Sequence, residues 1–325
     1  MMKKTELESS YELCAKICSV SGSNFVSAFR FLSSRQRRAM EVVYAFMRIA
    51  DDLVDSTQSA SERAERLDEF QNSFREKCIS GNSLNSVLEN LPEKREFSAI
   101  FPALAEVMRE FAVPGEYFLE ALRGVRMDLE RSCYTTVEEL ETYCYHVAST
   151  VGLICLHIWG IAPEEIRPDA ETDTFRAAVA CGKALQWTNF LRDVVEDAQN
   201  GRLYLPLEDW EPENSVNSRD LLDSEKFSVY NPVAEEIRTA ILRKDEEKLL
   251  PILRVNLERA ERFYQESRTL LSLIPRENRP IFFLITEVYH EIFLKIRRNP
   301  TQIFERRVKL AKIEKMWLYV RSFFC

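Results

Sequence analysis

Two short acidic runs stand out because their oxygen-bearing side chains recur at helical spacing. The first contains Tyr44, Arg48, Asp51 and Asp55, separated by four, three and four residues and therefore on one face of a helix. Asp51 and Asp55 would project side by side, and their like charges repel unless a cation lies between them. Hard divalent cations prefer such ligands, and Mg²⁺ commonly binds one or two carboxylates together with substrate phosphate oxygens. Arg48, one turn earlier, is placed to contact the same phosphate.

The second run repeats this pattern within an apolar stretch. Asn189, Asp193 and Asp197 recur at four-residue intervals, and Gln186 lies one turn before Asn189. Most residues between them are apolar, so we expect this helix to be largely buried. Burying carboxylates without a counter-charge is costly. The run therefore indicates a metal site, flanked by Arg192.

Together the runs predict a particular chemistry. Two carboxylate-bearing helices that face each other across a cavity would hold several Mg²⁺ ions, or Mn²⁺ in their place, around one or two diphosphates. Neutralising its charge makes diphosphate a better leaving group and permits ionisation to an allylic cation. The remaining wall would be apolar and aromatic, to hold a hydrocarbon chain and keep water from the cation. For either run alone, a solvated acidic surface patch is the alternative.

The elements that position these residues are predicted to be helices. Gly and Pro supply only 8 and 12 of the 325 residues and 46% are hydrophobic, which argues against a β-sandwich, a collagen-like chain or a disordered chain. We expect residues 206–231 to form a loop over one face, and residues 1–325 to form a single all-α domain. Helical periodicity predicts helices over 6–19, 23–32, 35–55, 61–79, 97–111, 114–131, 136–158, 172–198, 232–246, 249–273, 278–298 and from about 300.

Composition also restricts partners and compartment. The net charge of −8, without a basic block, argues against nucleic acid as a partner. Eight scattered cysteines in a chain large enough to fold without disulfides indicate reduced thiols and a cytoplasmic protein. The sequence lacks a signal peptide and any run of about 18 apolar residues that could span a membrane. We expect the aromatic-rich end, Met316–Cys325, to pack on the core, with peripheral membrane contact left open.

The two runs resemble the signatures of the squalene/phytoene synthases, the head-to-head branch of the all-α isoprenoid synthases. Tyr44-x3-Arg48-x2-Asp51-Asp52-x2-Asp55 resembles the first aspartate-rich signature. The second is similar to Gln186-x2-Asn189-x2-Arg192-Asp193-x3-Asp197, followed by Gly201-Arg202-Leu-Tyr204-Leu-Pro206. The segment Tyr143–Gly152 resembles the central helix of that family, and Phe25-x3-Phe29 resembles a segment near its N-terminus. The likeness extends from about Ser21 to Lys315.

The resemblance implies an isoprenoid synthase fold, with helices surrounding a central active-site cavity, and a role for each motif residue. Magnesium would be held by Asp51, Asp55, Asn189, Asp193 and Asp197. Diphosphate oxygens would be held by Arg48, Arg192 and Arg306. The reaction centre would be lined by Tyr44, Tyr143, Gln186 and Tyr289. The prenyl chains would lie against Phe25, Phe29, Val147, Ala148 and Val151.

The activity implied by the resemblance couples two prenyl diphosphates. One would ionise, the double bond of the second would attack its C1 atom, and loss of a proton would close a cyclopropane. We favour C15 farnesyl diphosphate, because Phe29 is bulky where phytoene synthases, which use C20 geranylgeranyl diphosphate, tend to have a smaller residue. The C30 product would be presqualene diphosphate, squalene or dehydrosqualene. NADPH would be needed only if the reaction proceeds to squalene.

Two further interpretations stay open alongside a C20-specific phytoene synthase. A class I terpene cyclase uses the same fold, but its second motif normally has Ser or Thr where this chain has Arg192. A non-catalytic helical scaffold would have no need of buried, mutually repelling carboxylates. The sequence leaves the final product and the oligomeric state undetermined.

Overall fold

The computed structural model describes residues 4–21, 24–56, 58–80, 97–169, 171–210 and 231–325. Within these ranges the chain is helical and forms no β-strand, so the all-α prediction is confirmed. Of the predicted loop 206–231, residues 211–230 lie outside the described part. The α-helices are α1 (Lys4–Val20), α2 (Asn24–Ala28), α3 (Ser34–Val54), α4 (Ala60–Phe74), α6 (Phe101–Glu110), α7 (Gly115–Glu130), α8 (Val137–Cys144), α9 (Thr150–Ile158), α10 (Asp173–Gln199), α12 (Pro232–Arg243), α13 (Glu246–Ser267), α14 (Leu270–Leu273), α15 (Arg279–Arg298), α16 (Gln302–Glu305) and α17 (Lys312–Arg321).

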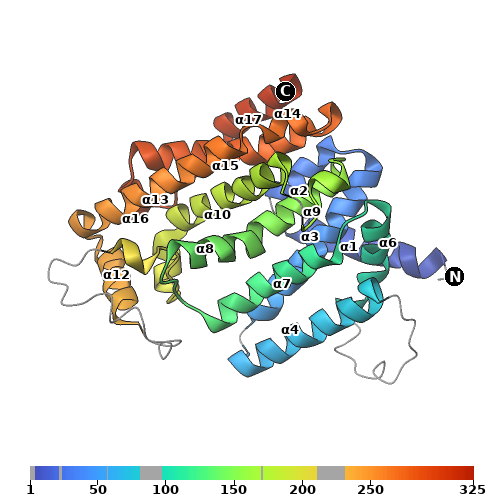
Figure 1. Ribbon diagram of the computed structural model, residues 1–325, viewed down its shortest axis with the longest axis horizontal. Coiled ribbons are helices and arrows are strands. Elements are labelled where there is room, and N and C mark those ends of the chain that lie inside the picture. Colours follow the sequence, from blue (N-terminus) through green and yellow to red (C-terminus); the bar gives the residue numbers. More distant parts are fainter. Residues whose placement is uncertain (1–3, 22–23, 57, 81–96, 170, 211–230) are drawn as a thin grey trace.

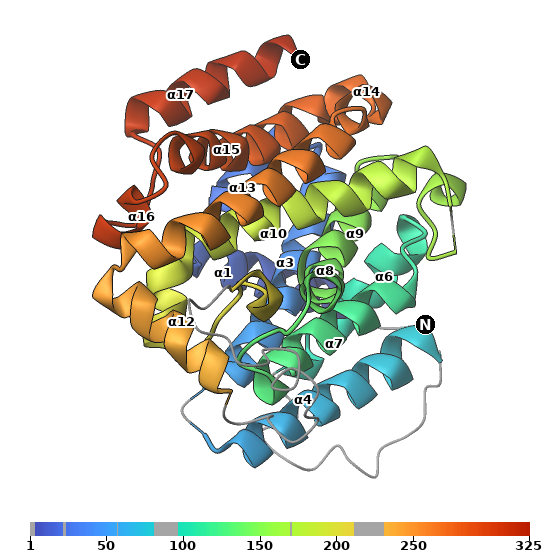
Figure 2. The same ribbon diagram turned by 60° about the vertical axis from the view of Figure 1, so that its left-hand side comes forward.

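The long helix α10 lies in the middle of the bundle. It packs against α13, α15 and α12, and also against α9 and α8 (Figures 1 and 2). The buried apolar residues form two clusters, one centred on α3, α4, α6, α7 and α9, the other on α10, α12, α13 and α15. Leu284 of α15 packs against both clusters. The prediction of one domain over residues 1–325 stays a prediction.

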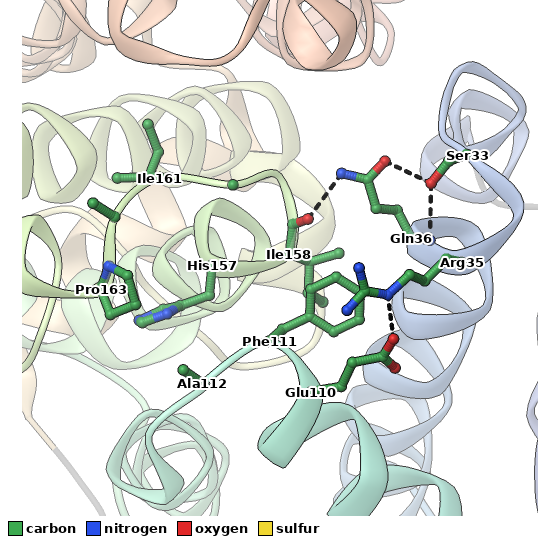
Figure 3. Close-up of a pocket in the computed structure, with 12 residues that line it drawn as sticks. Ser33, Arg35, Gln36, Glu110, Phe111, Ala112, His157, Ile158, Ile161 and Pro163 are labelled. Carbon is green, nitrogen blue, oxygen red and sulfur yellow. Dashed lines mark hydrogen bonds and ion pairs between the residues drawn. The ribbon is translucent and has the colours of Figure 1, made fainter.

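The start of α3 is fixed by contacts with α6 and α9. Ser33 caps the helix by accepting a hydrogen bond from the Gln36 backbone N–H, and the Gln36 side chain donates to the Ile158 carbonyl at 3.0 Å. Arg35 pairs with Glu110 across a pocket of about 450 Å³ (Figure 3). This pocket lies at the opposite end of α3 from the first acidic run and contains none of the predicted site residues. Its polar contacts therefore serve to hold the helix that carries that run.

The predicted helix over 136–158 contains a π-helical turn, Tyr145–Ser149, between α8 and α9. Two glycines allow neighbouring helices to approach this turn closely. A Cβ on Gly182 of α10 would lie 2.5 Å from the Ser149 Cα, and a Cβ on Gly124 of α7 would lie 2.6 Å from the Val147 Cγ1. A π turn shifts the faces of the helix that contains it and occurs frequently at functional sites. Here it packs the central helix directly between α7 and α10.

The prediction of one continuous helix from about residue 300 is wrong. Helix α16 ends at Glu305, α17 begins at Lys312, and the residues between them are not helical. Val308 and Leu310 are buried in the second apolar cluster, whereas Lys309 between them is exposed. This two-residue alternation suits an extended chain, because a helix would point Val308 and Leu310 in nearly opposite directions.

Candidate active site

The first acidic run occupies the C-terminal part of α3, and its predicted common face is confirmed. Arg48, Asp51 and Asp55 are exposed and Tyr44 is half-buried, whereas most residues between them are buried. Arg48 forms an ion pair with Asp52, with 2.7 Å between Nη2 and Oδ1. The carboxylates lie at the negative end of the helix dipole, where no basic residue follows in the last turn. This face of α3 therefore carries negative charge that its own arginine only partly balances.

The pKa of Asp51 reflects that excess charge. Although the Asp51 side chain reaches solvent, the protein around its carboxyl group reduces the hydration of the charge, and the neighbouring Asp55 repels that charge. These effects outweigh the attraction of Arg48 and raise the pKa of Asp51 to about 7. A bound cation would relieve both effects.

The second acidic run follows one side of the C-terminal part of α10. The Asn189 amide donates a hydrogen bond to the Gln186 side-chain oxygen at 3.2 Å. The Asn189 Oδ1 atom is buried and accepts no hydrogen bond from any described residue. Burial and the nearby Asp193 raise the pKa of Asp197 to about 7, against the attraction of Arg202. An acceptor without a donor and a carboxyl group of raised pKa are both features that a cation would satisfy.

Asp193 is surrounded by two arginines. The Nε atoms of Arg192 and Arg307 each lie 2.8 Å from Oδ1, and the Nη2 atoms of both arginines contact Oδ2. A carboxylate has about four lone-pair sites, and three of these contacts are hydrogen bonds that occupy most of them. Burial opposes the charge on Arg192, but hydrogen bonding to Asp193, with a further contribution from Tyr289, raises the pKa of Arg192.

The two acidic runs meet at one site. The Nη2 atom of Arg202, in the turn after α10, lies 3.9 Å from the Asp55 Oδ1. Asp128 of α7 contributes to the raised pKa values of both Asp51 and Asp197, so its carboxylate lies between the runs. The structure thus brings together carboxylates from α3, α7 and α10.

Asp128 is a site residue that the sequence pattern did not reveal. Its two oxygens lie 2.9 Å from the Tyr143 hydroxyl, and its Oδ1 also lies 2.9 Å from the Tyr204 hydroxyl, so both tyrosines donate to it. Burial raises the pKa of Asp128, although Arg202 and the two hydroxyls counteract that rise. No second carboxylate lies at helical spacing from Asp128. The available signal was its position between the apolar residues Met127 and Leu129.

The tyrosines that hold Asp128 belong to an aromatic stack. The rings of Tyr143 and Tyr204 are 5.4 Å apart and nearly parallel, and those of Tyr204 and Phe190 are 4.7 Å apart. Ring faces carry negative electrostatic potential and attract cations. The predicted reaction-centre residue Tyr143 thus lies beside the acidic runs.

The residues predicted to contact hydrocarbon lie on two elements, the central helix and the N-terminal segment that contains Phe25 and Phe29. Val147, Ala148 and Val151 are half-buried on the central helix, and a Cβ on the adjacent Gly152 would meet no atom within 4 Å, so open space adjoins this face. Phe29 is buried, and the exposed Phe25 packs on Tyr289 with 5.9 Å between ring centroids. The N-terminal segment is thereby joined to α15. The roles of these side chains stay predictions.

Arg306 forms no ion pair with the acidic runs among the described residues. It is exposed, and its guanidinium lies 2.6 Å from the Gln302 side-chain amide. Its neighbour Arg307 instead contacts Asp193 and Glu196, the latter at 3.4 Å. The helix ends before this pair, and the extended backbone at Arg306 lets Arg307 reach Asp193. The phosphate-binding role of Arg306 stays a prediction.

The donor atoms suit a cation that is shared with a ligand. Among the described residues, no three His, Cys, Asp or Glu side chains are grouped closely enough to form a metal site by themselves. The runs offer carboxylate oxygens and the buried Asn189 Oδ1, the all-oxygen set that Mg²⁺ takes together with phosphate oxygens. All eight cysteines are free thiols. No described helix combines the length and the apolar character needed to cross a bilayer.

Sequence comparison relates the chain to known proteins over most of its length. The family profile described as squalene/phytoene synthase matches residues 19–314. A chloroplastic phytoene synthase of Narcissus pseudonarcissus is 28% identical over 310 residues, which cover 95% of this chain and 65% of that protein. This chain therefore spans just under two thirds of that relative. The phytoene synthase of Arthrospira platensis is 29% identical over 312 residues, covering 94% of this chain and 90% of that protein.

Solved structures share the same arrangement of helices. A dehydrosqualene synthase has a TM-score of 0.72 and 25% identity, covering 98% of this chain and 97% of its own. The squalene synthase HpnC from Alicyclobacillus acidocaldarius has a TM-score of 0.69 and 25% identity, covering 91% of this chain and 96% of its own. The expected isoprenoid synthase fold is thereby confirmed.

Proposed function

The chain belongs to the squalene/phytoene synthase family, and on that basis we propose that it is a prenyltransferase that couples two prenyl diphosphates head to head. The observation that carries this proposal is the meeting of two acidic runs, with Arg202 reaching from the end of α10 to Asp55 at the end of α3. Carboxylates and arginines at one place suit a polyanionic ligand that binds together with divalent cations. A non-catalytic scaffold would gain nothing from such crowded charge.

Magnesium, replaceable by Mn²⁺, is the proposed cofactor. When bound, it supplies positive charge that stabilises the departing diphosphate. Arg192, Arg202 and Arg307 lie beside the acidic runs and add permanent positive charge for diphosphate oxygens. The proposed ligands are Asp51 and Asp55 on one side, and Asn189, Asp193 and Asp197 on the other.

The proposed reaction begins with cleavage of the C1–O bond of one prenyl diphosphate, whose electron pair leaves with the diphosphate. The C2=C3 electrons of the second molecule then form a bond to that C1 atom, and a proton leaves as the cyclopropane closes. Tyr204, the half-buried member of the aromatic stack, would place its electron-rich ring near the positive charge. The apolar face at Val147 and Val151 holds hydrocarbon and excludes water.

The proposed substrate is the C15 farnesyl diphosphate, giving a C30 product, because Phe29 is bulky and its side chain is buried. A structural relative named as a dehydrosqualene synthase supports this choice. The C20 geranylgeranyl diphosphate is the second candidate, because the sequence relatives reported above are named phytoene synthases. NADPH is expected to matter only if squalene is the product.

The test is to incubate the purified protein and Mg²⁺ with each diphosphate, with and without NADPH, and to identify products by mass spectrometry. A C30 product from farnesyl diphosphate, lost in Asp193→Ala but retained in Asp173→Ala, would support the proposal. Asp173 is the matched control because it lies on the same helix but is strongly exposed at its start. Coupling of only the C20 substrate would replace the proposed chain length. Cyclic products from single molecules would indicate a terpene cyclase, and inertness towards both substrates would contradict the enzyme assignment.

A further inference from the structure

The C-terminal helix presents an unusual row of exposed apolar side chains. Such residues recur along α17 and the short 3₁₀ turn Ser322–Phe324 that follows it, at spacings of three, one, three and four. At about 100° per residue they fall within an arc of about 100°. They are Ile313, Met316, Trp317, Val320 and Phe324, exposed by 70, 61, 62, 44 and 86%. We call this row the outer stripe.

The other side of the helix packs on the protein, as expected for the aromatic-rich end. Leu318 and Ser322 are buried, and α17 lies against α15 at the edge of the bundle (Figure 2). The rings of Tyr319 and Phe323 pack on Phe31, with centroids 5.2 and 5.4 Å away. The outer stripe therefore lies on the side of α17 that faces away from the protein, and the described part of the chain does not cover it.

Positive charge accompanies the outer stripe. Residues 305–325 contain six Lys or Arg and two Glu, although the whole chain has a net charge of −8. Lys312 and Arg321 fall on either side of the stripe at helical spacing, and both are exposed. An apolar stripe flanked by basic residues and containing Trp and Phe is typical of helices that lie in the plane of a membrane surface.

Charge also decides between a membrane and a second copy of the chain. A symmetric dimer through the outer stripe would bring the same basic residues of both copies together and so incur repulsion. A surface of anionic lipid would attract them. The ten residues of α17 are too few to span a bilayer, so contact is limited to the interface.

We propose that the outer stripe docks this protein on the surface of an anionic membrane. Phe31, which supports Tyr319 and Phe323, lies in the same short segment as Phe25 and Phe29. Docking through the outer stripe would therefore place α17 between the bilayer and Phe31.

The test uses the full-length protein and vesicles of phosphatidylcholine, with or without phosphatidylglycerol, in a co-sedimentation assay. We expect binding only to vesicles that contain phosphatidylglycerol. The variant Ile313→Glu/Trp317→Glu should reduce the partition coefficient by about tenfold or more, and Lys312→Glu by about fivefold or more. The matched control is Leu242→Glu, which changes an apolar residue of α12 exposed to a similar degree. Unchanged melting temperatures would show that the variants remain folded.

Tryptophan fluorescence gives an independent readout. Trp159, Trp187 and Trp210 are buried, so a blue shift on adding vesicles reports on Trp317, the fourth tryptophan of the chain. No shift and no sedimentation, or sedimentation that is equal for Ile313→Glu/Trp317→Glu and the unaltered protein, would overturn the proposal. A dimer that this variant dissociates, without vesicle binding by the unaltered protein, would overturn it in favour of a second copy.

Discussion

The Nη2 atom of Arg202 lies 3.9 Å from Oδ1 of Asp55 and so joins the turn after α10 to the end of α3. The same guanidinium lowers the pKa values of Asp128 and Asp197 against the effect of burial. One arginine thus compensates carboxylates from three elements that are far apart in the sequence. In the absence of ligand, Arg202 therefore offsets part of the repulsion among these carboxylates.

Replacing Arg202 with alanine should lower both activity and stability. We expect turnover to fall by about 100-fold, because a cation beside the diphosphate site is lost. The melting temperature of the metal-free protein should fall more at about pH 8 than at about pH 5, where the carboxyl groups of raised pKa carry protons. Calorimetry at both pH values would measure this, with Arg131→Ala as the control for an exposed arginine paired to Glu139. An equal loss at both pH values would contradict the electrostatic role.

Neutralising Asp197 should stabilise the metal-free protein while abolishing turnover. Its pKa is about 7 in the folded chain and near its ordinary value of 3.8 in the unfolded chain. The unfolded state therefore releases the proton first, and stability falls as pH rises from about 4 to about 7. Asp197→Asn should remove this loss, so its metal-free melting temperature at about pH 8 should exceed that of the unaltered protein.

The same charge predicts how magnesium affects stability. Added Mg²⁺ should raise the melting temperature of the unaltered protein more at about pH 8 than at about pH 5, because ligands that bind only the folded state stabilise it and the carboxylates must be ionised to bind. Asp197→Asn should respond less. A lower metal-free melting temperature for Asp197→Asn at the higher pH would refute the proposed repulsion.

Asp128 is a positioning residue, because it holds the hydroxyl groups of Tyr143 and Tyr204. Asp128→Asn weakens both hydrogen bonds by removing the charge of the acceptor, and kcat should fall by about 10- to 100-fold with a smaller change in KM. The loss in Asp128→Asn/Tyr143→Phe should be smaller than the product of the two single losses, because the residues act together. Glu130→Gln, an exposed change on the same helix, is the control. Multiplicative losses would mean that Asp128 acts independently of Tyr143.

Two glycine variants should have opposite effects on the free energy of unfolding, because only Gly182 lies at the close contact between α10 and the π turn. In Gly182→Ala the new Cβ would lie 2.5 Å from the Ser149 Cα, so one helix must move, with an expected loss of roughly 1–3 kcal/mol. In Gly152→Ala the new Cβ meets no atom within 4 Å, and alanine should stabilise the helix by roughly 0.5–1 kcal/mol. Denaturant unfolding would measure both. Similar effects in the two variants would show that the close approach is not required.

Phe29 should govern which prenyl diphosphate is accepted. It is 3% exposed, and shortening it enlarges the space available to the hydrocarbon tail. The C40-to-C30 product ratio in a mixture of both substrates should rise by about tenfold in Phe29→Ala. Phe29→Leu provides a milder change in case the smaller side chain destabilises the fold. Phe31→Ala is the control because Phe31 packs on Tyr319 and Phe323 instead, and an equal shift in product ratio there would argue against a specific role for Phe29.

The sequence predicted what depends on local spacing. The helices and the shared faces of the two acidic runs followed from periodicity alone, because side chains three and four residues apart necessarily lie together on a helix. Asp128 could not be predicted in this way, since its partners Tyr143 and Tyr204 lie 15 and 76 residues further along the chain. Its place in the site results from the packing of α7 beside the π turn.

The extended segment near residue 308 was missed for a related reason. Lys309, between Val308 and Leu310, fits a helical surface as readily as an extended one, and only the burial of both apolar side chains selects the extended conformation. That choice brought Arg307, and not the predicted Arg306, to Asp193. The family resemblance pointed to Arg306, whereas the extended backbone brings its neighbour Arg307 to Asp193.

Asp193 accepts three hydrogen bonds from Arg192 and Arg307 and has one further ion-pair contact with Arg307. A divalent cation that binds the Asp193 carboxylate must displace the Arg192 or the Arg307 guanidinium, because these two groups already contact both of its oxygens. The displaced guanidinium then becomes available to a phosphate oxygen. Cation and diphosphate should consequently bind with positive cooperativity, each increasing the affinity for the other by the same factor. Without either of them, Asp193 stays charge-balanced by its own chain.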